Sequence, residues 1–312
     1  MITKELQQRI LEALQQSREN FTGSDIKFSV SIGINPAQYS RIKNGDTEKV
    51  LSDAQWVMLA RRLGVSPTNA PEWKTVNTPV FRFISTQLEF CQEKSTSALL
   101  CDLSDIGKTY TAVHYAKTHK NVVYVDCSQV KSKQKLVRYI AKEFGVGGTG
   151  KYSDVYENLV FYLKTLPTPL IILDEAGDLD YSAFLEIKAL WNATELACGW
   201  YMMGADGLQA KIERGISNRK VGFREVFSRF SDRFSNIVPP ERSEKMNFYK
   251  KLIIDVLSAN CTDKEAISTI VKKCLVQQGG NIGGLRRAES VLNTCPTAFL
   301  AEPNTSLSTM LI

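Results

Sequence analysis

The chain has 312 residues, of which 43% are hydrophobic, and a formal net charge of +6. This length allows two or three domains with cores of their own, and the mild positive charge permits nucleic-acid binding without requiring it. The seven cysteines include no C-x-x-C pair, and there are only two histidines, so neither a zinc site nor a disulfide framework is expected. No signal peptide opens the chain and no apolar run reaches membrane length, which favours a soluble protein of the reducing cytoplasm.

Residues 1–66 are predicted to form a small helical domain. Apolar residues between Leu6 and Leu14 recur at helical spacing, and a further helix is expected over 51–63. Between them, a turn at Gly33 precedes Asn35, which can cap a helix that has Pro36 at its first position.

Two short helices around a tight turn are typical of a helix-turn-helix, whose second helix enters the major groove. Gln and Arg side chains on such a helix can pair with base edges. The alternative is a packing or dimerisation module with a solvated polar face. The candidate DNA contacts on this helix are Gln38, Tyr39, Arg41 and Lys43.

Residues 67–80 carry three prolines among polar residues, which is typical of a linker. From 81 to 240 helix and strand signals alternate, which predicts an α/β core with a five-stranded parallel sheet and helices on both faces. The expected strands are 97–101, 121–127, 169–173, 199–203 and 235–238, and the expected helices are 110–116, 134–144, 153–163, 183–196 and 222–233.

A phosphate-binding loop is predicted after the first strand. Gly-Lys-Thr at 107–109 ends the pattern G-x-x-x-x-G-K-[ST], in which backbone N–H groups and a helix N-terminus cradle phosphates. Asp102 and Asp105 stand where many such loops carry glycine. Carboxylates repel a polyphosphate, and a non-glycine residue at positive φ is strained, so a degraded loop is expected. The expected nucleotide contacts here are Ile106, Gly107, Lys108, Thr109 and Tyr110.

Gly-Lys-Thr alone could equally be a chance tripeptide at a strand-helix junction. The third strand favours a nucleotide site over this alternative. The apolar run 170–173 ends in Asp174 and Glu175. Asp174, with Thr109, can hold magnesium, and Glu175 can orient an attacking water. The two tracts together predict a triphosphatase that uses ATP and Mg²⁺.

The C-terminal part is predicted to be helical. Helices are expected at 243–258, 263–277 and 283–293, which would form a helical lid over residues 241–295, and residues 296–312 lack periodicity and are expected to be a flexible tail.

The order of these tracts resembles the AAA+ ATPases. Preceded by a helix-turn-helix, it resembles over almost the whole chain the target-DNA activator family of transposition helpers, to which phage Mu B belongs. The tracts that carry the resemblance are Gly107 to Thr109, Leu170 to Ala176, Met203-Gly204, Phe227 to Arg229 and Gly284 to Arg286.

The resemblance implies roles for individual residues. Lys108 would contact the β- and γ-phosphates, Thr109 and Asp174 would hold Mg²⁺, and Glu175 would position the water. Asp206 is the candidate γ-phosphate sensor, although Ala205 stands where the family pattern has Asn. Arg229, or as second choice Arg233, would be an arginine finger supplied across a subunit interface. Arg286 matches the second sensor, in the lid.

Basic residues follow the second strand at a connection that faces the central channel of AAA+ rings. They could track a phosphate backbone without base specificity, or belong to a solvated helix start. They are Lys131, Lys133 and Lys135. A second basic tract, which is either DNA-facing or an interface, comprises Lys211, Arg214, Arg219, Lys220 and Arg224.

The resemblance implies a helper ATPase that assembles on double-stranded DNA as an ATP-dependent helical oligomer and recruits a transposase, with hydrolysis driving disassembly. One alternative is a replication helicase loader of the same AAA+ branch. The other is a helix-turn-helix regulator with a degenerate nucleotide site, an interpretation that Asp102 and Asp105 keep open.

Overall fold

The computed structural model describes residues 2–66, 73–276 and 282–294. Residues 67–72 of the expected linker and the expected tail at 296–312 lie outside this part. The chain divides into two compact units. One comprises the segments Met1–Thr68, Ile84–Asp102 and Thr109–Asn236, and the other Asn69–Phe83, Leu103–Lys108 and Ile237–Ile312. The phosphate loop therefore groups with the C-terminal helices.

The N-terminal helices are α1 (Lys4–Glu19), α2 (Asp25–Ile32), α3 (Pro36–Lys43) and α4 (Asp53–Leu63). Each begins at a capping side chain, and Asn35 and Gln38 form a reciprocal capping box at α3. Gly33 ends α2 with φ 80°, a left-handed conformation that favours glycine.

The expectation that Tyr39 lies on the exposed face of α3 is wrong. Its side chain is only 4% exposed, and its ring packs edge-on against Phe28 with centroids 5.2 Å apart. Tyr39 is three residues from the buried Ile42, so both lie on the core face of the helix.

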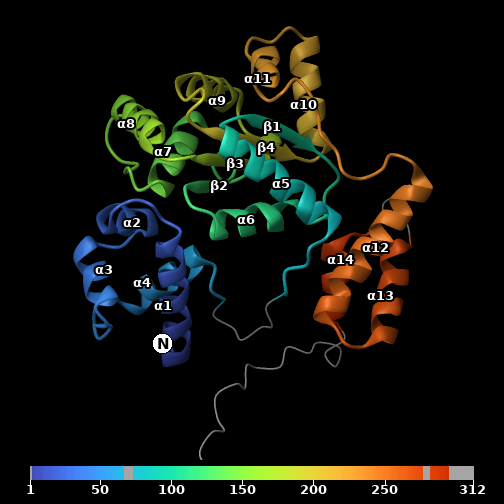
Figure 1. Cartoon of the computed structure of the whole chain (residues 1–312), viewed down its shortest axis with the longest axis horizontal. Coiled ribbons are helices and arrows are strands. Elements are labelled where there is room, and N and C mark those ends of the chain that lie inside the picture. The colour runs from blue at the N-terminus through green and yellow to red at the C-terminus, as the bar shows by residue number, and fades with distance from the viewer. Residues whose placement is uncertain (1, 67–72, 277–281, 295–312) are drawn as a thin grey trace, which may run out of the picture. The chain divides into compact units, whose positions relative to one another are not determined.

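A parallel sheet forms the centre of the first unit (Figure 1). In the described residues it has four strands in the order β1-β4-β3-β2, namely β1 (Ser97–Cys101), β2 (Val122–Asp126), β3 (Leu170–Asp174) and β4 (Gly199–Gly204). Its helices are α5 (Pro79–Lys94), α6 (Lys108–Thr118), α7 (Lys133–Glu143), α8 (Tyr152–Thr165), α9 (Tyr181–Ala193), α10 (Asp206–Ser217) and α11 (Phe223–Arg229). The α/β prediction is confirmed, whereas α5 and α10 have no counterpart among the expected helices.

The expected fifth strand at 235–238 is wrong. Only Ser235 pairs, as an isolated parallel bridge to Leu100 in β1. Its N–H donates to Leu99 O and its carbonyl accepts from Cys101 N, both at 3.0 Å. Pro239 and Pro240, which have no N–H to donate, come directly after the expected strand, so pairing could not have extended past Val238.

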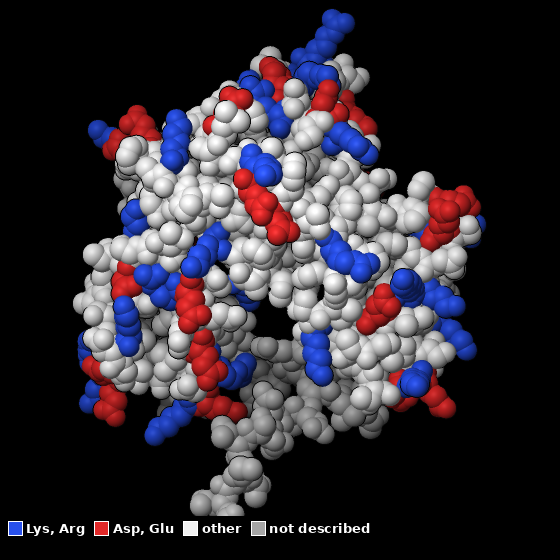
Figure 2. All heavy atoms as spheres, viewed as in Figure 1, with Lys and Arg blue, Asp and Glu red and all other residues white. Residues whose placement is uncertain are grey.

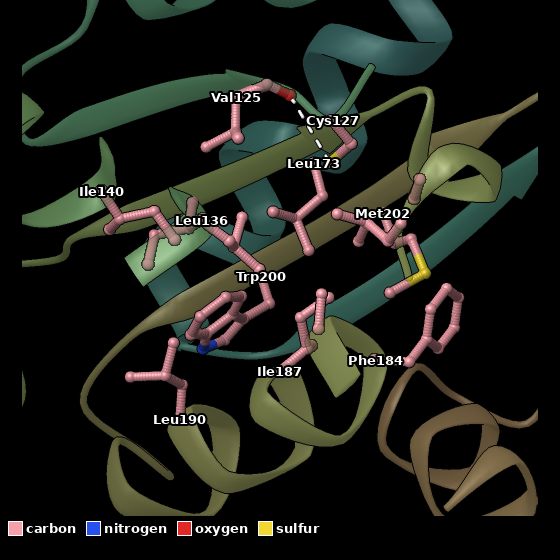
Figure 3. Packing of buried hydrophobic residues seen from close by; sticks show 14 of the residues in the cluster. Val125, Cys127, Leu136, Ile140, Leu173, Phe184, Ile187, Leu190, Trp200 and Met202 are labelled. Atoms are coloured by element: carbon pink, nitrogen blue, oxygen red, sulfur yellow. Dashed lines mark hydrogen bonds between the residues drawn. The ribbon is translucent and has the colours of Figure 1, made fainter. Parts of the chain in front are cut away.

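Alternating strand residues pack against helices on the two faces of the sheet. Trp200, Leu173 and Met202 point from the strands toward Ile187 on α9 (Figure 3). Leu136 and Ile140 of α7 belong to the same fully buried cluster. On the opposite face, Tyr201 donates to Gln87 Oε1 of α5 at 2.7 Å. Burial of each large apolar side chain is worth roughly 1.5–3 kcal/mol, so both helical layers hold the sheet in place.

The second unit contains α12 (Arg242–Asn260), α13 (Lys264–Leu275) and α14 (Leu285–Asn293). Their apolar faces form a cluster of their own, with Ile253, Ile270 and Leu292 buried at its centre. Asp263 caps α13 by accepting from the N–H groups of Glu265 and Ala266. Within the described ranges, no helix is both long and apolar enough to cross a membrane.

Candidate nucleotide-binding site

The polar side chains expected at the site follow the carboxyl ends of the strands. Cys101 and Gly204 lie opposite each other at the ends of β1 and β4, and Asp174 is the last residue of β3. Because the strands are parallel, these ends meet at one edge of the sheet. This is the edge at which open α/β sheets bind ligands.

Asp174 is 1% exposed, and its carboxylate is held by three hydrogen bonds. Oδ2 accepts from the Thr109 hydroxyl at 2.7 Å and from the Tyr124 hydroxyl at 2.9 Å, and Oδ1 accepts from Glu175 N at 2.8 Å. Burial, and then the nearby Asp174 carboxylate, raise the pKa of Tyr124, which keeps this phenol a donor. A hydroxyl and a carboxylate side by side are the oxygen ligands that suit Mg²⁺.

Glu175 is exposed beyond the strand end, with φ 49°. The 3₁₀ turn Ala176–Asp178 follows it directly. A non-glycine residue in the left-handed region persists only where its surroundings hold it. The backbone on both sides of Glu175 is held, by Asp174 at one end and by this turn at the other.

Lys211 of α10 supplies part of that support, a role that the sequence did not indicate. Its ammonium donates to Gly177 O at 2.8 Å and also to Leu179 O, and it lies 5.0 Å from the centroid of the Phe184 ring. Burial lowers the pKa of Lys211. The expectation of a surface cation in a basic tract is therefore wrong for Lys211.

Lys220 and Arg224 of the same tract are also engaged in local contacts. Lys220 lies 4.0 Å from the centroid of the Tyr181 ring, and Arg224 makes a bidentate ion pair with Asp232 at 2.7 and 2.9 Å. Arg214 is exposed on α10. These contacts stabilise the α10–α11 region and leave less free charge than the sequence implies.

The phosphate loop has left-handed residues at Asp105 (φ 69°) and Gly107 (φ 99°). The Lys108 ammonium donates to Leu103 O at 2.6 Å. Ile106 is 1% exposed, so its side chain belongs to the core and only its backbone is suited to phosphate contact. Asp102 is not in the left-handed region, so glycine is not required at this first position of the loop.

Tyr110 lies in the first turn of α6 and is 45% exposed, with its ring stacked against His114 at 6.2 Å between centroids. Asp206 begins α10 directly after β4, and its Oδ1 accepts from Gly207 N. Arg286 is exposed in the first turn of α14, and its N–H donates to Asp105 Oδ1 at 2.6 Å.

The two candidate finger arginines differ in their surroundings. The Arg229 guanidinium donates to Asn192 Oδ1 at 2.6 Å and to Glu225 O at 2.8 Å, and it lies over the Trp191 ring. Arg233 is exposed in the segment after α11. Arg229 is thus occupied within its own chain, whereas Arg233 extends into solvent.

The candidate DNA-contacting lysines are partly neutralised. Lys131 pairs with Asp178 at 3.2 Å, and Lys133 pairs at 2.9 Å with Glu186, whose side chain is 10% exposed. Lys135 is exposed on α7. Lys and Arg are mixed with Asp and Glu across the face shown in Figure 2, so charge does not accumulate there as one basic patch.

On α3, Gln38 is committed to structure, because its amide accepts from Asn35 N and donates to Val50 O. Arg41 and Lys43 are exposed and pair at 2.8 Å with Asp46 and Asp25. Hydrogen bonds from Lys43 and then Arg18 lower the pKa of Asp25. Exposed ion pairs are worth little, so both cations are available to a phosphate.

Comparisons with known proteins agree with this architecture. Residues 91–212 match the model of an AAA domain family. The chain is 26% identical over 215 residues to the Mu-like prophage FluMu DNA transposition protein B of Haemophilus influenzae, covering 67% of this chain and 73% of that protein. It is also 26% identical over 192 residues to the ATP-dependent target DNA activator B of Escherichia phage Mu, covering 61% of this chain and 59% of that protein.

Among solved structures, the Aeropyrum pernix ORC1 protein in complex with DNA is similar, with a TM-score of 0.53 at 18% identity over 72% of this chain and 61% of that chain. That likeness concerns the fold alone, a parallel sheet with flanking helices, and the sheet lies within the region around residues 91–212 that matches the AAA domain model. The chain resembles the prophage and phage B proteins, and the match spans less than two thirds of the phage Mu protein.

Proposed function

We propose that this chain is an ATP-dependent, DNA-binding helper of DNA transposition. The observation that carries the proposal is the hydrogen bond from Thr109 to Asp174, which joins the Gly-Lys-Thr helix to the acidic end of β3. This pairing occurs in a chain that resembles proteins named as a transposition protein and as an ATP-dependent target DNA activator.

ATP with Mg²⁺ is the proposed substrate. Lys108 would balance phosphate charge, the loop N–H groups and the start of α6 would hold the phosphates, and Thr109 with Asp174 would hold the metal. Glu175 would orient a water for attack on the γ-phosphorus, with cleavage of the bond to the bridging oxygen that leaves with ADP. Asp206 and Arg286 are the proposed sensors of the γ-phosphate.

The arginine finger is proposed to come from a neighbouring subunit. Arg233 is the better candidate, because the Arg229 guanidinium already binds Asn192 and Glu225 of its own chain. This reverses the preference drawn from the sequence. An arginine supplied in trans makes hydrolysis depend on assembly, which fits an oligomer that is stable with ATP and disassembles after hydrolysis.

DNA contact is proposed through Arg41 and Lys43 of α3, with Lys135 and more weakly Lys131 and Lys133 near the core sheet. Arg41, Lys43 and Lys131 can leave an exposed acid for a phosphate at little cost, whereas Lys133 is paired with the nearly buried Glu186. A transposase is the proposed partner that engages the assembled protein and stimulates hydrolysis.

The decisive experiment is electron microscopy of the purified protein on random-sequence duplex DNA, with and without ATP and Mg²⁺. Filaments that form only with ATP, and that Lys108→Ala abolishes, are the expected result. Binding to one operator sequence regardless of ATP would overturn the proposal in favour of a helix-turn-helix regulator. Stimulation of ATP turnover by a replicative helicase in place of a transposase would favour a helicase loader.

A further inference from the structure

Asp105, the acidic residue that makes the phosphate loop look defective, is bound to the first turn of α14. Its Oδ2 accepts from Gly284 N at 3.0 Å, its Oδ1 from Arg286 N at 2.6 Å, and its backbone carbonyl from Leu285 N at 3.0 Å. Both segments lie in the same compact unit. Three consecutive N–H groups of α14 are thus taken by one residue about 180 positions earlier in the chain.

These are the bonds that a helix N-cap normally supplies. The first N–H groups of a helix have no partner within the helix, and a carboxylate there also meets the positive end of the helix dipole. The residue at the N-cap of α14 is Gly284, which has no side chain to offer. Asp105 therefore caps α14 from outside, and its carboxylate is directed to the lid helix.

Glycine at 284 allows this close approach. A Cβ placed on Gly284 would lie 2.3 Å from Asp105 O and 2.8 Å from Asp105 Oδ2, which is closer than any side chain could fit. Asp105 has φ 69°, a conformation that Asp adopts more readily than most residues. The contact therefore needs Gly at 284 and a short carboxylate at 105.

We infer that Asp105 is a positioning residue that docks the lid helix carrying Arg286 onto the phosphate loop, so that the loop and the lid respond to nucleotide as one body. The nucleotide part of this inference rests on the proposed function. Asp105 then transmits nucleotide binding at the loop to the lid helix. A glycine at 105 would give a loop closer to the standard pattern but would no longer hold α14 to it.

The first test uses no nucleotide and compares amide hydrogen exchange of α14 in the full chain. Asp105→Gly removes the cap and relieves the backbone, and Gly284→Ala forces the two segments apart. In both variants, the amide exchange rate at residues 284–286 is expected to rise about fivefold to tenfold, which corresponds to the free energy lost with a helix N-cap. Asp105→Asn, which keeps one acceptor, should fall between them and wild type.

Matched controls separate this joint from general lid stability. Asp263→Ala removes a cap with two backbone bonds from α13 of the same unit. Gly207→Ala adds a methyl group where nothing lies within 4 Å. Neither should change exchange at 284–286. If Asp105→Gly leaves this exchange unaltered, or if Asp263→Ala alters it equally, Asp105 does not hold the lid.

The second test adds a non-hydrolysable ATP analogue. Wild type should gain protection over α14, whereas Asp105→Gly should bind the analogue at least as tightly, because a carboxylate is gone, and show no gain there. Equal gains in both proteins would overturn the coupling. If wild type does not bind the analogue, the proposed function and the coupling both fail, while the first test still decides whether Asp105 caps the lid.

Discussion

The Thr109 hydroxyl donates to Asp174 Oδ2 at 2.7 Å, although the two residues are 65 positions apart. The bond ties the first turn of α6 to the end of β3. Tyr124 and the Glu175 N–H bind the same carboxylate, so three donors fix the position of the Asp174 side chain. Oxygen ligands held in place in this way lose less entropy when they take a metal.

Thr109→Ala should therefore weaken binding of ATP in the presence of Mg²⁺ by about tenfold to a hundredfold, the value of a bond to a charged group. Thr109→Ser keeps the hydroxyl and should stay within about threefold of wild type. Titration with a fluorescent ATP analogue, with Mg²⁺ and with EDTA, measures both. Equal affinity of the alanine variant and wild type in Mg²⁺ would remove Thr109 from the metal site.

Lys211→Met should lower the hydrolysis rate at saturating ATP by roughly tenfold to a hundredfold, because Glu175 loses the support of its turn and small misplacements are costly. ATP affinity should stay nearly unchanged, since the contacts of Lys211, to the carbonyls of Gly177 and Leu179 and to the Phe184 ring, involve no residue proposed to bind the nucleotide. Steady-state kinetics combined with equilibrium binding separates the two effects.

Arg214→Met is the control, because Arg214 is an exposed cation on the same helix. It should keep full activity. A loss of affinity without a loss of turnover in Lys211→Met would contradict a role in positioning Glu175.

Some of this site could be predicted from the sequence. The buried run that ends in Asp174 and the Gly-Lys-Thr turn depend on local pattern, and parallel strands bring their carboxyl ends to one edge whatever the details. The four strands of the described sheet could also be predicted from local pattern, because a short apolar run between two helices most often forms a buried parallel strand.

The errors involve contacts between distant segments. Whether Lys211 reaches solvent or two carbonyls depends on where α10 packs, and no local pattern encodes that. From the sequence, Asp105 is interpreted as a defect of the phosphate loop, because its hydrogen-bond partners, Gly284 and Arg286, lie about 180 positions further along the chain. Tyr39 is a different kind of error, since its spacing from Ile42 already placed it on the core face.

Arg233→Ala should reduce hydrolysis by the assembled protein about a thousandfold, the loss expected of an arginine finger. Mixing it with Glu175→Gln, which removes the catalytic carboxylate and keeps the proposed nucleotide contacts, should restore activity, because one variant keeps an intact site and the other an intact finger. No recovery on mixing would exclude a finger supplied in trans.

Arg229→Ala should instead lower the free energy of unfolding by about 1–2 kcal/mol, because it removes the hydrogen bond to Asn192 and the contact with the Trp191 ring.

Lys135→Ala should weaken binding to random-sequence duplex and reduce the slope of log affinity against log salt by about one, as expected when one phosphate contact is lost. Lys164→Ala, at an exposed position on α8, is the charge-matched control and should leave the slope unchanged. Lys133→Ala should change the slope less, because Lys133 already pairs with Glu186.

Lys133→Ala should act mainly on stability. Without the lysine, Glu186 keeps only the Tyr152 hydroxyl at 2.6 Å as a side-chain partner among the contacts described, and stability should fall by about 1–3 kcal/mol. Urea unfolding beside DNA titrations over a salt series distinguishes the two lysines. A loss of one full unit of slope in Lys133→Ala with no loss of stability would mean that a DNA phosphate displaces Glu186 from Lys133.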